Sequence, residues 1–206
     1  MSVKLFCVEG PIAAGKSTTI RILEDAKIDG VKIIFLSEPI ESWRSVGGMN
    51  LLDEFYKDQS RWALLFQIEA YTSRLKMVEK AIKENEGCGN VAIVIERSWI
   101  NDRMVFGHLL HKDGKMLDME WEAYCNLHEF LLSKAPKIDA MIYLDTSPEE
   151  CLRRKKHRAR EEEEATPDDY ILRVAERYAE VSNGPGAYLT QSCNSKEILD
   201  IISSHF

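Results

Sequence analysis

Short apolar, β-branched runs alternate along the chain with longer segments in which apolar residues recur at helical spacing. The runs are near-continuous, which is typical of parallel strands buried on both faces, and they cover residues 4–8, 31–36, 91–95, 138–144 and 187–191. The helical segments cover residues 16–27, 59–84, 118–133, 148–160, 168–182 and 195–203. This alternation predicts an α/β fold built on a doubly wound parallel sheet.

The sequence shows no repeat, low-complexity tract or linker that would divide it, so we expect a single domain over residues 1–206. A hydrophobic fraction of 45% with 30% charged residues is ordinary for a folded globular chain and excludes a disordered one. With 27 basic and 34 acidic residues the net charge is -7, which argues against nonspecific binding to nucleic acid or to acidic membranes. An anionic ligand therefore requires a local basic site.

Five cysteines are scattered along the chain, odd in number and never in CxxC spacing. This pattern argues against a disulfide framework and against structural zinc. No apolar run approaches the roughly 20 residues of a membrane span, and the first strand pattern begins at Val3 without a leader. We therefore expect a cytoplasmic protein with no membrane partner.

The segment after the first predicted strand satisfies the phosphate-loop pattern GxxxxGK[ST] and opens a helix, the context that this motif requires. Its backbone amides can surround phosphate oxygens, Lys16 can reach the terminal phosphates, and Ser17 can bind magnesium. The predicted donor-binding residues are Gly10, Ala13, Ala14, Gly15, Lys16, Ser17 and Thr18. The sequence thus predicts a site for a nucleoside triphosphate such as ATP.

Carboxylates follow the second and third strands, where ligands bind in parallel α/β sheets. Glu38 can act as a general base for an acceptor hydroxyl, or it can cap the turn before Pro39. Glu96 suits magnesium or its water shell, and the adjacent Arg97 can orient an oxyanion. A structural ion pair is the alternative for Glu96 and Arg97.

Gln67 and Arg74 lie two turns apart in the helix predicted over residues 59–84, so they face the same way and both could contact one planar base. The helical pattern alone favours an exposed polar stripe instead. The aromatic residues Trp43, Phe66 and Phe106 fit a hydrophobic core, although they could also enclose a ring.

A run of basic residues, from Arg153 to Arg160, precedes four consecutive glutamates. Such a run can form a solvated helix with local charge pairs. In a phosphate-loop protein it favours a lid over residues 154–164, whose Arg154, Arg158 and Arg160 would stabilise the transferring phosphoryl group.

Five ordered segments, GPIAAGKST, SEP with a following W, FQIEAYTSR, ERSWINDRMVF and CLRRKKHRAR, resemble the deoxynucleoside kinase family, nearest its deoxycytidine and deoxyguanosine kinase branch. The resemblance runs from about Val3 to Arg177. It implies the phosphate-loop nucleoside-kinase fold, with a five-stranded parallel sheet, flanking helices and an Arg-rich lid, usually in a homodimer. It also implies transfer of the γ-phosphoryl group of ATP, with magnesium, to the 5'-hydroxyl of a deoxynucleoside.

The resemblance implies specific roles for individual residues. Glu38 would be the general base, Arg97 would orient the hydroxyl, and Glu96 would hold magnesium with Ser17. The phosphates would be clamped by Lys16, Arg154, Arg158 and Arg160. The acceptor would be contacted by Gln67 and Phe106 at its base and by Tyr56 and Glu163 at the sugar, in a pocket that includes Trp43 and Phe66.

Arg74 and Asp102 match the family pair that favours deoxycytidine and purine deoxynucleosides over thymidine. A carboxylate paired with Arg74 occupies the space of a thymine methyl group and can accept from an exocyclic amine. The resemblance therefore predicts deoxycytidine as the first acceptor, followed by deoxyadenosine and deoxyguanosine. Family members often stack the donor base on an aromatic residue after the last strand, but residues 191–197, QSCNSKE, contain none.

Two other interpretations remain open at this point. A nucleoside monophosphate kinase, such as a thymidylate kinase, shares the phosphate loop and lid but needs basic groups for the acceptor phosphate, where this chain has Glu38 and Glu41. A nucleotide-dependent switch or assembly ATPase would hydrolyse its nucleotide without any acceptor.

Overall fold

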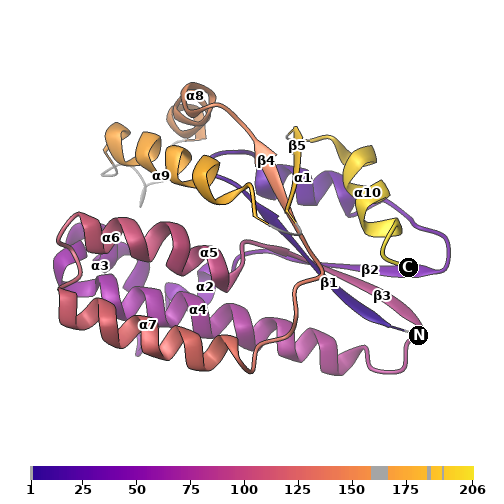
Figure 1. The fold of residues 1–206 in the computed structure, drawn as a ribbon, viewed down its shortest axis with the longest axis horizontal. Helices are drawn as coiled ribbons and strands as arrows, with labels where there is room; N and C mark the ends of the chain where they lie inside the picture. The colour runs from indigo at the N-terminus through magenta and orange to yellow at the C-terminus, as the bar shows by residue number, and fades with distance from the viewer. Residues whose placement is uncertain (1, 159–166, 185–186, 192) are drawn as a thin grey trace.

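Five parallel strands form one sheet, in the order β2-β3-β1-β4-β5, in the computed structural model of the chain (Figure 1). The structure describes residues 2–158, 167–184, 187–191 and 193–206. The strands are β1 (Val3–Glu9), β2 (Val31–Leu36), β3 (Asn90–Glu96), β4 (Ala140–Asp145) and β5 (Ala187–Gln191). The predicted α/β fold with a five-stranded parallel sheet is confirmed.

Helices cover both faces of the sheet (Figure 1). Those with α-helical geometry are α1 (Lys16–Leu23), α2 (Ile40–Trp43), α3 (Leu51–Lys57), α4 (Gln59–Glu84), α5 (Trp99–Asn101), α6 (His108–Lys112), α7 (Asp118–Leu132), α8 (Pro148–Arg158), α9 (Asp168–Val181) and α10 (Ser195–Ser203). Between α5 and α6, residues Asp102–Gly107 form a π-helix, η1.

Successive side chains of the central strand enter different hydrophobic cores, because side chains alternate between the two faces of a strand. Leu5 and Cys7 pack in one core with residues of α4, including Tyr71. Phe6 and Val8 pack in another with residues of α1, α9 and α10. Both faces of β1 are therefore buried, which explains its continuous apolar pattern.

The register of the sheet brings the ends of three strands together. Val8 of β1 pairs with Glu96 of β3, and Glu9 pairs with Tyr143 of β4. The segments that follow β1 and β3 therefore leave the sheet at the same edge, where polar residues can converge.

The predicted long helix agrees with α4, which begins at Gln59 after Asp58 accepts a hydrogen bond from the backbone N–H of Arg61 at 3.1 Å. Several predicted boundaries differ from the structure by one residue, and two within the described residues were wrong by more. Helix α1 ends at Leu23 rather than residue 27, because the chain turns there and Ala26 donates to the Leu23 carbonyl at 2.9 Å. Strand β4 begins at Ala140 rather than residue 138, and the Asp139 carboxylate instead accepts from the backbone N–H of Leu5 at 2.9 Å.

The pattern gave no sign of the short helices between β2 and α4, or of the segment between β3 and α7. Helices α2 and α3 have four and seven residues, too few for a helical period to stand out. These elements form a third core with α4 and α7, around residues such as Trp43, Phe55 and Phe66. That core lies beyond the sheet and encloses the pocket described next.

Candidate functional site

The phosphate loop connects β1 to α1, as predicted. Gly10 and Gly15 have φ values of 148° and 102°, which favour glycine. A Cβ atom on Gly10 would also lie 3.2 Å from that of Ala14, which is tighter than ordinary contact. Lys16 is buried and donates from Nζ to the carbonyls of Gly10 and Pro11 at 3.1 and 2.8 Å. Burial, followed by the charge of Arg97, lowers the pKa of Lys16 to about 8.

Ser17 and Glu96 meet beside this loop. Ser17 Oγ donates to Glu96 Oε1 at 2.9 Å, and Glu96 is only 5% exposed. Burial, then the nearby negative charge of Glu38, raises the pKa of Glu96. A hydroxyl and a carboxylate fit Mg²⁺, which prefers oxygen ligands and retains several waters. No cluster of three or more His, Cys, Asp or Glu ligands occurs among the described residues.

A cavity on the outer side of the loop fits the donor phosphates. It is lined by the predicted residues Ala13, Gly15, Lys16, Ser17, Thr18 and Arg154, with Glu96 between this cavity and the next. Arg154 donates from Nη1 to the carbonyl of Ala14 at 2.8 Å, so α8 is tied to the loop. Of the other predicted lid residues, Arg160 and Glu163 lie outside the described residues, and so does the side chain of Arg158.

Four residues of the donor cavity were not assigned to the site from the sequence, although two of them, Arg153 and His157, belong to the basic run. Their side chains come from α1, α8 and the turn after β5, and they are Arg21, Arg153, His157 and Cys193. Arg21 stands one turn beyond Ser17, a spacing that could have placed it on the same face. Cys193 lies in the segment noted for lacking an aromatic residue, and its backbone N–H donates to the Thr19 hydroxyl of α1 at 3.1 Å. The thiol lies 3.9 Å from the hydroxyl of Thr19.

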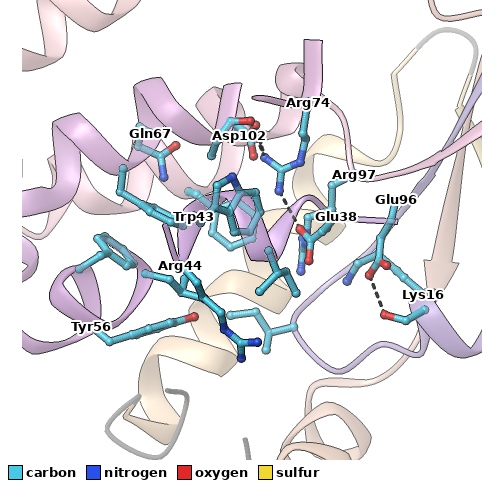
Figure 2. A pocket seen from close by; sticks show the side chains of 18 of the residues that line it. Lys16, Glu38, Trp43, Arg44, Tyr56, Gln67, Arg74, Glu96, Arg97 and Asp102 are labelled. Atoms are coloured by element: carbon cyan, nitrogen blue, oxygen red, sulfur yellow. Dashed lines mark hydrogen bonds and ion pairs between the residues drawn. The ribbon is translucent and has the colours of Figure 1, made fainter. Parts of the chain in front are cut away.

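A second cavity adjoins the loop on the side of α2, α3, α4 and η1 (Figure 2). It contains every acceptor-site residue predicted within the described chain, namely Glu38, Trp43, Tyr56, Phe66, Gln67, Arg74, Arg97, Asp102 and Phe106. Lys16, Ser17 and Glu96 line the same cavity, so the phosphate loop forms one of its walls. Residues that the sequence analysis did not identify also line it, among them Ile12, Ile40, Arg44, Leu52, Phe55, Ala70 and Tyr170.

The exposed polar stripe that the helical pattern favoured for α4 is wrong at two positions. Gln67 and Arg74 are each only 3% exposed. The helix is covered on this side by α2, α3 and η1, which the sequence pattern did not reveal. Two buried polar side chains that line one cavity can recognise the hydrogen-bonding edge of a base.

The aromatic residues serve both as core and as pocket wall. Phe55 and Phe66 stack with ring centroids 4.4 Å apart, and the Trp43 ring meets Phe66 edge to face at 5.5 Å. Trp43 also donates from Nε1 to Ser73 Oγ at 2.9 Å, a contact that the sequence did not indicate. These rings form a firm apolar wall that can contact a flat heterocycle.

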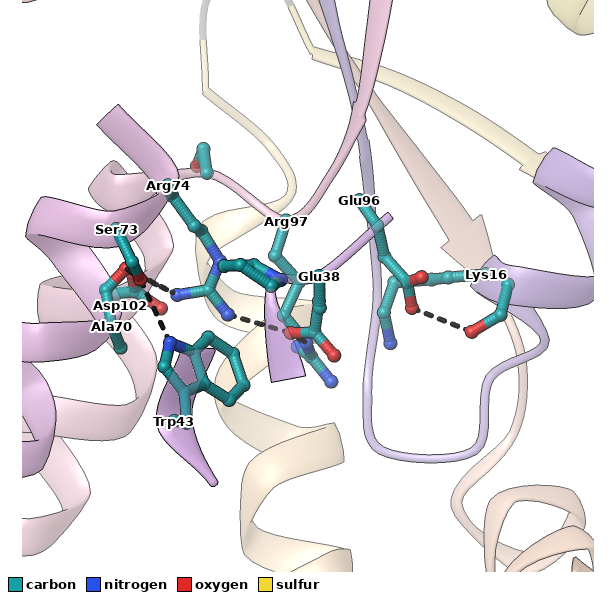
Figure 3. A network of polar contacts seen from close by, with 12 residues as sticks. Lys16, Glu38, Trp43, Ala70, Ser73, Arg74, Glu96, Arg97 and Asp102 are labelled. Carbon is teal, nitrogen blue, oxygen red and sulfur yellow. Dashed lines mark hydrogen bonds and ion pairs between the residues drawn. The ribbon is translucent and has the colours of Figure 1, made fainter. Parts of the chain in front are cut away.

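A network of charges crosses the cavity (Figure 3). Arg74 donates from Nη1 to Asp102 at 2.5 Å and from Nη2 to Glu38 at 2.7 Å. Arg97 Nε lies 3.0 Å from the same oxygen of Glu38. Glu38 thus bridges two guanidinium groups, and the simple turn cap considered for it does not describe its position.

The network separates the ionisation of its two carboxyl groups. Burial favours the neutral form of Glu38, but Arg97, Arg74 and Lys16 outweigh it and lower the pKa to about 2. Burial raises the pKa of Asp102 to about 6, with Arg74 opposing the shift. Glu38 is therefore ionised at neutral pH and can accept a hydrogen bond from a hydroxyl, whereas the pKa of Asp102 lies well above that of an ordinary aspartate.

The π-helical turn η1 brings two predicted residues into the cavity. Its first residue, Asp102, meets Arg74, and its fifth, Phe106, lies under Arg97 with the guanidinium carbon 4.8 Å from the ring centroid. The wider turn of a π-helix alters which side chains share a face, and such turns are frequent at functional sites. Gly107 closes the turn where a Cβ would come within 3.0 Å of the Tyr124 ring.

The two cavities together suit the transfer of a phosphoryl group. Donor phosphates at the loop would approach an acceptor whose ring lies between aromatic side chains and polar groups, with a carboxylate and a guanidinium at the junction.

No helix in the described part of the chain is both long and apolar enough to cross a bilayer.

Comparison with known proteins supports the same class of site. The family model described as deoxynucleoside kinase matches residues 6–203. Similar proteins include a probable deoxycytidine kinase of fowlpox virus, 41% identical over 169 residues, and the mitochondrial thymidine kinase 2 of Macaca fascicularis, 34% identical over 170 residues. The mitochondrial deoxyguanosine kinase of Xenopus laevis is 31% identical over 199 residues.

The alignments to these three relatives cover 82%, 81% and 86% of this chain, in the same order. They cover 67%, 60% and 72% of the relatives. The chain thus spans about two thirds of the length of the curated relatives it matches. The family resemblance predicted from the five ordered segments is confirmed.

Proposed function

The chain belongs to the deoxynucleoside kinase family, and on that premise we propose that it transfers the γ-phosphoryl group of ATP to the 5'-hydroxyl of a deoxynucleoside. The observation that carries the proposal is the position of Glu38, which lines the acceptor cavity together with Lys16 and Ser17 of the phosphate loop. A carboxylate at this junction can bind the hydroxyl of an acceptor next to the donor phosphates.

Each residue at the junction has a part in the proposed transfer. Glu38 accepts the hydrogen bond of the 5'-hydroxyl and takes its proton as the oxygen bonds to the γ-phosphorus. The bond between that phosphorus and the β–γ bridging oxygen breaks, so the products are a deoxynucleoside monophosphate and ADP. The transition state of such a transfer is largely dissociative, so a weakly basic but well-placed carboxylate suffices.

Positive groups stabilise the charge that gathers on the transferring group. Lys16 and Arg154 stand at the donor cavity, and we assign Arg158 and Arg160 to the same task on the basis of the family pattern. Ser17 and Glu96 would hold Mg²⁺ directly or through its water shell. When bound, the ion neutralises phosphate charge and aligns the β and γ groups.

Deoxycytidine is the proposed first acceptor, with deoxyadenosine and deoxyguanosine next. Asp102 and Arg74 are buried and paired at the far side of the cavity, where a base would leave little room for a methyl group. A base that offers an exocyclic amine can donate to Asp102, whereas thymine leaves this carboxyl without a partner. Gln67 and Phe106 contact the base, and Tyr56 and Glu163 the sugar, in this proposal.

A homodimer with one kinase domain per chain is proposed for the assembly. Met119 and Phe130 stand eleven residues, or about three turns, apart on α7, and their side chains are 77% and 58% exposed. This apolar face of α7 can be covered by a second copy. A cytoplasmic location is proposed because all five cysteines are free thiols, which suits a reducing compartment.

Product analysis tests the proposed reaction. The purified chain with ATP, Mg²⁺ and deoxycytidine should form deoxycytidine monophosphate and ADP in equal amounts. Release of ADP and phosphate without conversion of the nucleoside would contradict the proposal and favour a nucleotide-dependent switch.

A further inference from the structure

A fully buried carboxylate lies behind the active site. Glu9 is the last residue of β1, directly before Gly10, and is 0% exposed. It lines neither of the two cavities described above. In the sequence Glu9 is a polar residue at the end of an apolar strand, and the pattern of the strand does not indicate a function for it.

Four hydrogen-bond donors converge on this carboxylate. Oε1 accepts from the backbone N–H and the hydroxyl of Ser98 at 2.7 and 2.6 Å, and from the thiol of Cys7 at 3.3 Å. Oε2 accepts from the hydroxyl of Tyr178 at 3.1 Å. A site formed by donors alone suits an ionised carboxylate, which only accepts hydrogen bonds.

Tyr178 connects Arg97 to Glu9 through two hydrogen bonds, and each of them can have only one donor. Arg97 Nη1 donates to the Tyr178 hydroxyl at 2.6 Å, because a guanidinium has no acceptor. The single proton of Tyr178 is then free to go to Glu9. Burial raises the pKa of Tyr178 well above its usual value, so the hydroxyl keeps that proton. Tyr178 therefore links the positive charge of Arg97 to the negative charge of Glu9.

Glu9 also holds the backbone on which Arg97 stands. Arg97 has φ 65°, in the left-handed region that non-glycine residues rarely adopt. Its own N–H donates to the Val8 carbonyl at 3.0 Å, and the next N–H, of Ser98, donates to Glu9. Strained backbone of this kind persists only where its surroundings fix it, and Glu9 provides one of the two fixing contacts.

The Nε atom of the same guanidinium contacts Glu38, the proposed general base. Arg97 Nε lies 3.0 Å from Glu38, and Nη1 also donates to the Gly10 carbonyl at 3.0 Å. Arg97 is thus held from behind by Tyr178 and Gly10 while it contacts Glu38 in front. A shift of its backbone or of its rear contact would move it away from Glu38.

We propose that Glu9 is a positioning residue, which acts through Tyr178 and the Ser98 backbone to hold Arg97 against Glu38 and the acceptor hydroxyl. The inference rests on the proposed phosphotransfer and adds a residue that touches neither substrate. Glu9 also joins three separate elements at the active site, because Ser98 follows β3, Tyr178 belongs to α9, and Glu9 itself ends β1.

Two variants test this role, and a third is a matched control. Tyr178→Phe removes only the hydroxyl between Glu9 and Arg97, and Glu9→Gln keeps the shape of the side chain but removes its charge. Tyr143→Phe removes the hydroxyl of a buried tyrosine that lies beside Glu9 in the sheet but is hydrogen-bonded to Asn101 and Met141, outside the link from Glu9 through Tyr178 to Arg97. Each variant is assayed for kcat, for the KM of ATP, for the Kd of deoxycytidine measured without ATP, and for Tm.

Tyr178→Phe and Glu9→Gln should lower kcat by about 10²-fold, the scale of a small misplacement of a reacting group. The Kd of deoxycytidine and the KM of ATP should stay close to those of the unaltered protein, since Gln67 and Lys16 are untouched. Tyr143→Phe should keep its kcat. A merely structural role would lower Tm and the fraction of active protein in Tyr178→Phe and Glu9→Gln, but would leave kcat per active molecule unchanged.

An unchanged kcat in Tyr178→Phe, or an equal loss in Tyr143→Phe, would overturn the inference. Should Glu9→Gln fail to fold, Tyr178→Phe decides the matter alone. Failure of the proposed function would look different, because the unaltered protein itself would then show no transfer to a deoxynucleoside.

Discussion

Arg74 donates a hydrogen bond to Glu38, with 2.7 Å between Nη2 and Oε1. The other terminal nitrogen of the same guanidinium donates to Asp102. Arg74 therefore contacts both the carboxyl that we assign to base selection and the one that we assign to proton transfer. An acceptor that disturbs the pair of Arg74 and Asp102 would also disturb Glu38, so the choice of base can affect kcat as well as binding.

Replacing the proposed base should stop the reaction while sparing the donor site. Glu38→Gln keeps the shape of the side chain but cannot take a proton, so kcat should fall by roughly 10²–10⁴-fold. Binding of ATP should be nearly unchanged, because Glu38 does not line the donor cavity. Titration calorimetry and a product assay measure the two effects.

Glu41→Gln is the matched control, because this carboxylate lies three residues away in the chain with its side chain 86% exposed. It should leave kcat unaltered. Normal turnover by Glu38→Gln would mean that another group accepts the proton.

Removing the selectivity pair should favour thymidine. In Arg74→Met combined with Asp102→Ala, both partners are replaced, since Asp102 alone would be buried without its counterion. The ratio of kcat/KM for thymidine to that for deoxycytidine should rise by about tenfold or more. The kcat with deoxycytidine should fall, because Glu38 loses its contact with Arg74.

The exposed pair of Lys80 and Glu84 on the same helix offers a control for this double substitution. Lys80→Met with Glu84→Ala should not change the ratio. If the ratio also stays constant in the Arg74 and Asp102 variant, selectivity depends on other residues of the pocket.

Base selectivity should weaken as the solution becomes more acidic. Burial raises the pKa of Asp102 to about 6, so its carboxyl is almost fully ionised at about pH 7.5 and only about a quarter ionised at about pH 5.5. Protonation removes its ion pair with Arg74 and one acceptor for an exocyclic amine. The preference for deoxycytidine over thymidine should therefore fall roughly fourfold between those two pH values.

The pH profile of kcat/KM for the two nucleosides measures this effect. In Asp102→Asn, which cannot ionise, the preference should no longer change over the same range. A preference that varies with pH equally in this variant would assign the titration to another group.

The Mg²⁺ concentration that the enzyme requires should depend on Ser17 and Glu96, whose side chains are in contact. Ser17→Ala and Glu96→Gln each remove an oxygen ligand or its charge, so the half-saturating Mg²⁺ concentration should rise about tenfold. Binding of a fluorescent ATP analogue at increasing Mg²⁺ measures the change without relying on turnover. Glu24→Gln, at an exposed position just after α1, should behave like the unaltered protein. An unchanged requirement in Ser17→Ala and Glu96→Gln would place the ion elsewhere.

The apolar face of α7 should determine the oligomeric state. Light scattering should give about twice the chain mass of 23.6 kDa, and Phe130→Glu should give the single-chain mass, because burying the new charge is costly. Leu189→Glu, at a 51% exposed position on β5, is the control and should leave the dimer intact. A single-chain mass for the unaltered protein would contradict the proposed assembly.

The structural features that the sequence predicted around the candidate site are those with local signals. The phosphate loop is a continuous motif between a strand and a helix, and α4 has a capping residue and a long helical period. The position of Glu38 follows from the end of a strand. These features depend on neighbours in the chain, so the sequence displays them directly.

Features that depend on distant packing were predicted incorrectly or missed. The burial of Gln67 results from α2, α3 and η1, which are too short or irregular to show a period. Ser98 and Tyr178 meet Glu9 only when the segment after β3 and helix α9 pack against the end of β1. The shared contact of Glu38 with two arginines likewise requires three elements to meet, and no single segment contains that information.

The most direct test of the central claim compares acceptors under one set of conditions, with radiolabelled ATP and Mg²⁺ and separate reactions containing deoxycytidine, thymidine, thymidine monophosphate or no acceptor. The account predicts labelled deoxycytidine monophosphate as the main product, less product from thymidine, and little release of phosphate without an acceptor. Transfer to thymidine monophosphate alone would contradict it and indicate a nucleoside monophosphate kinase. Equal hydrolysis with and without acceptor would contradict it as well, and would indicate a nucleotide-dependent switch.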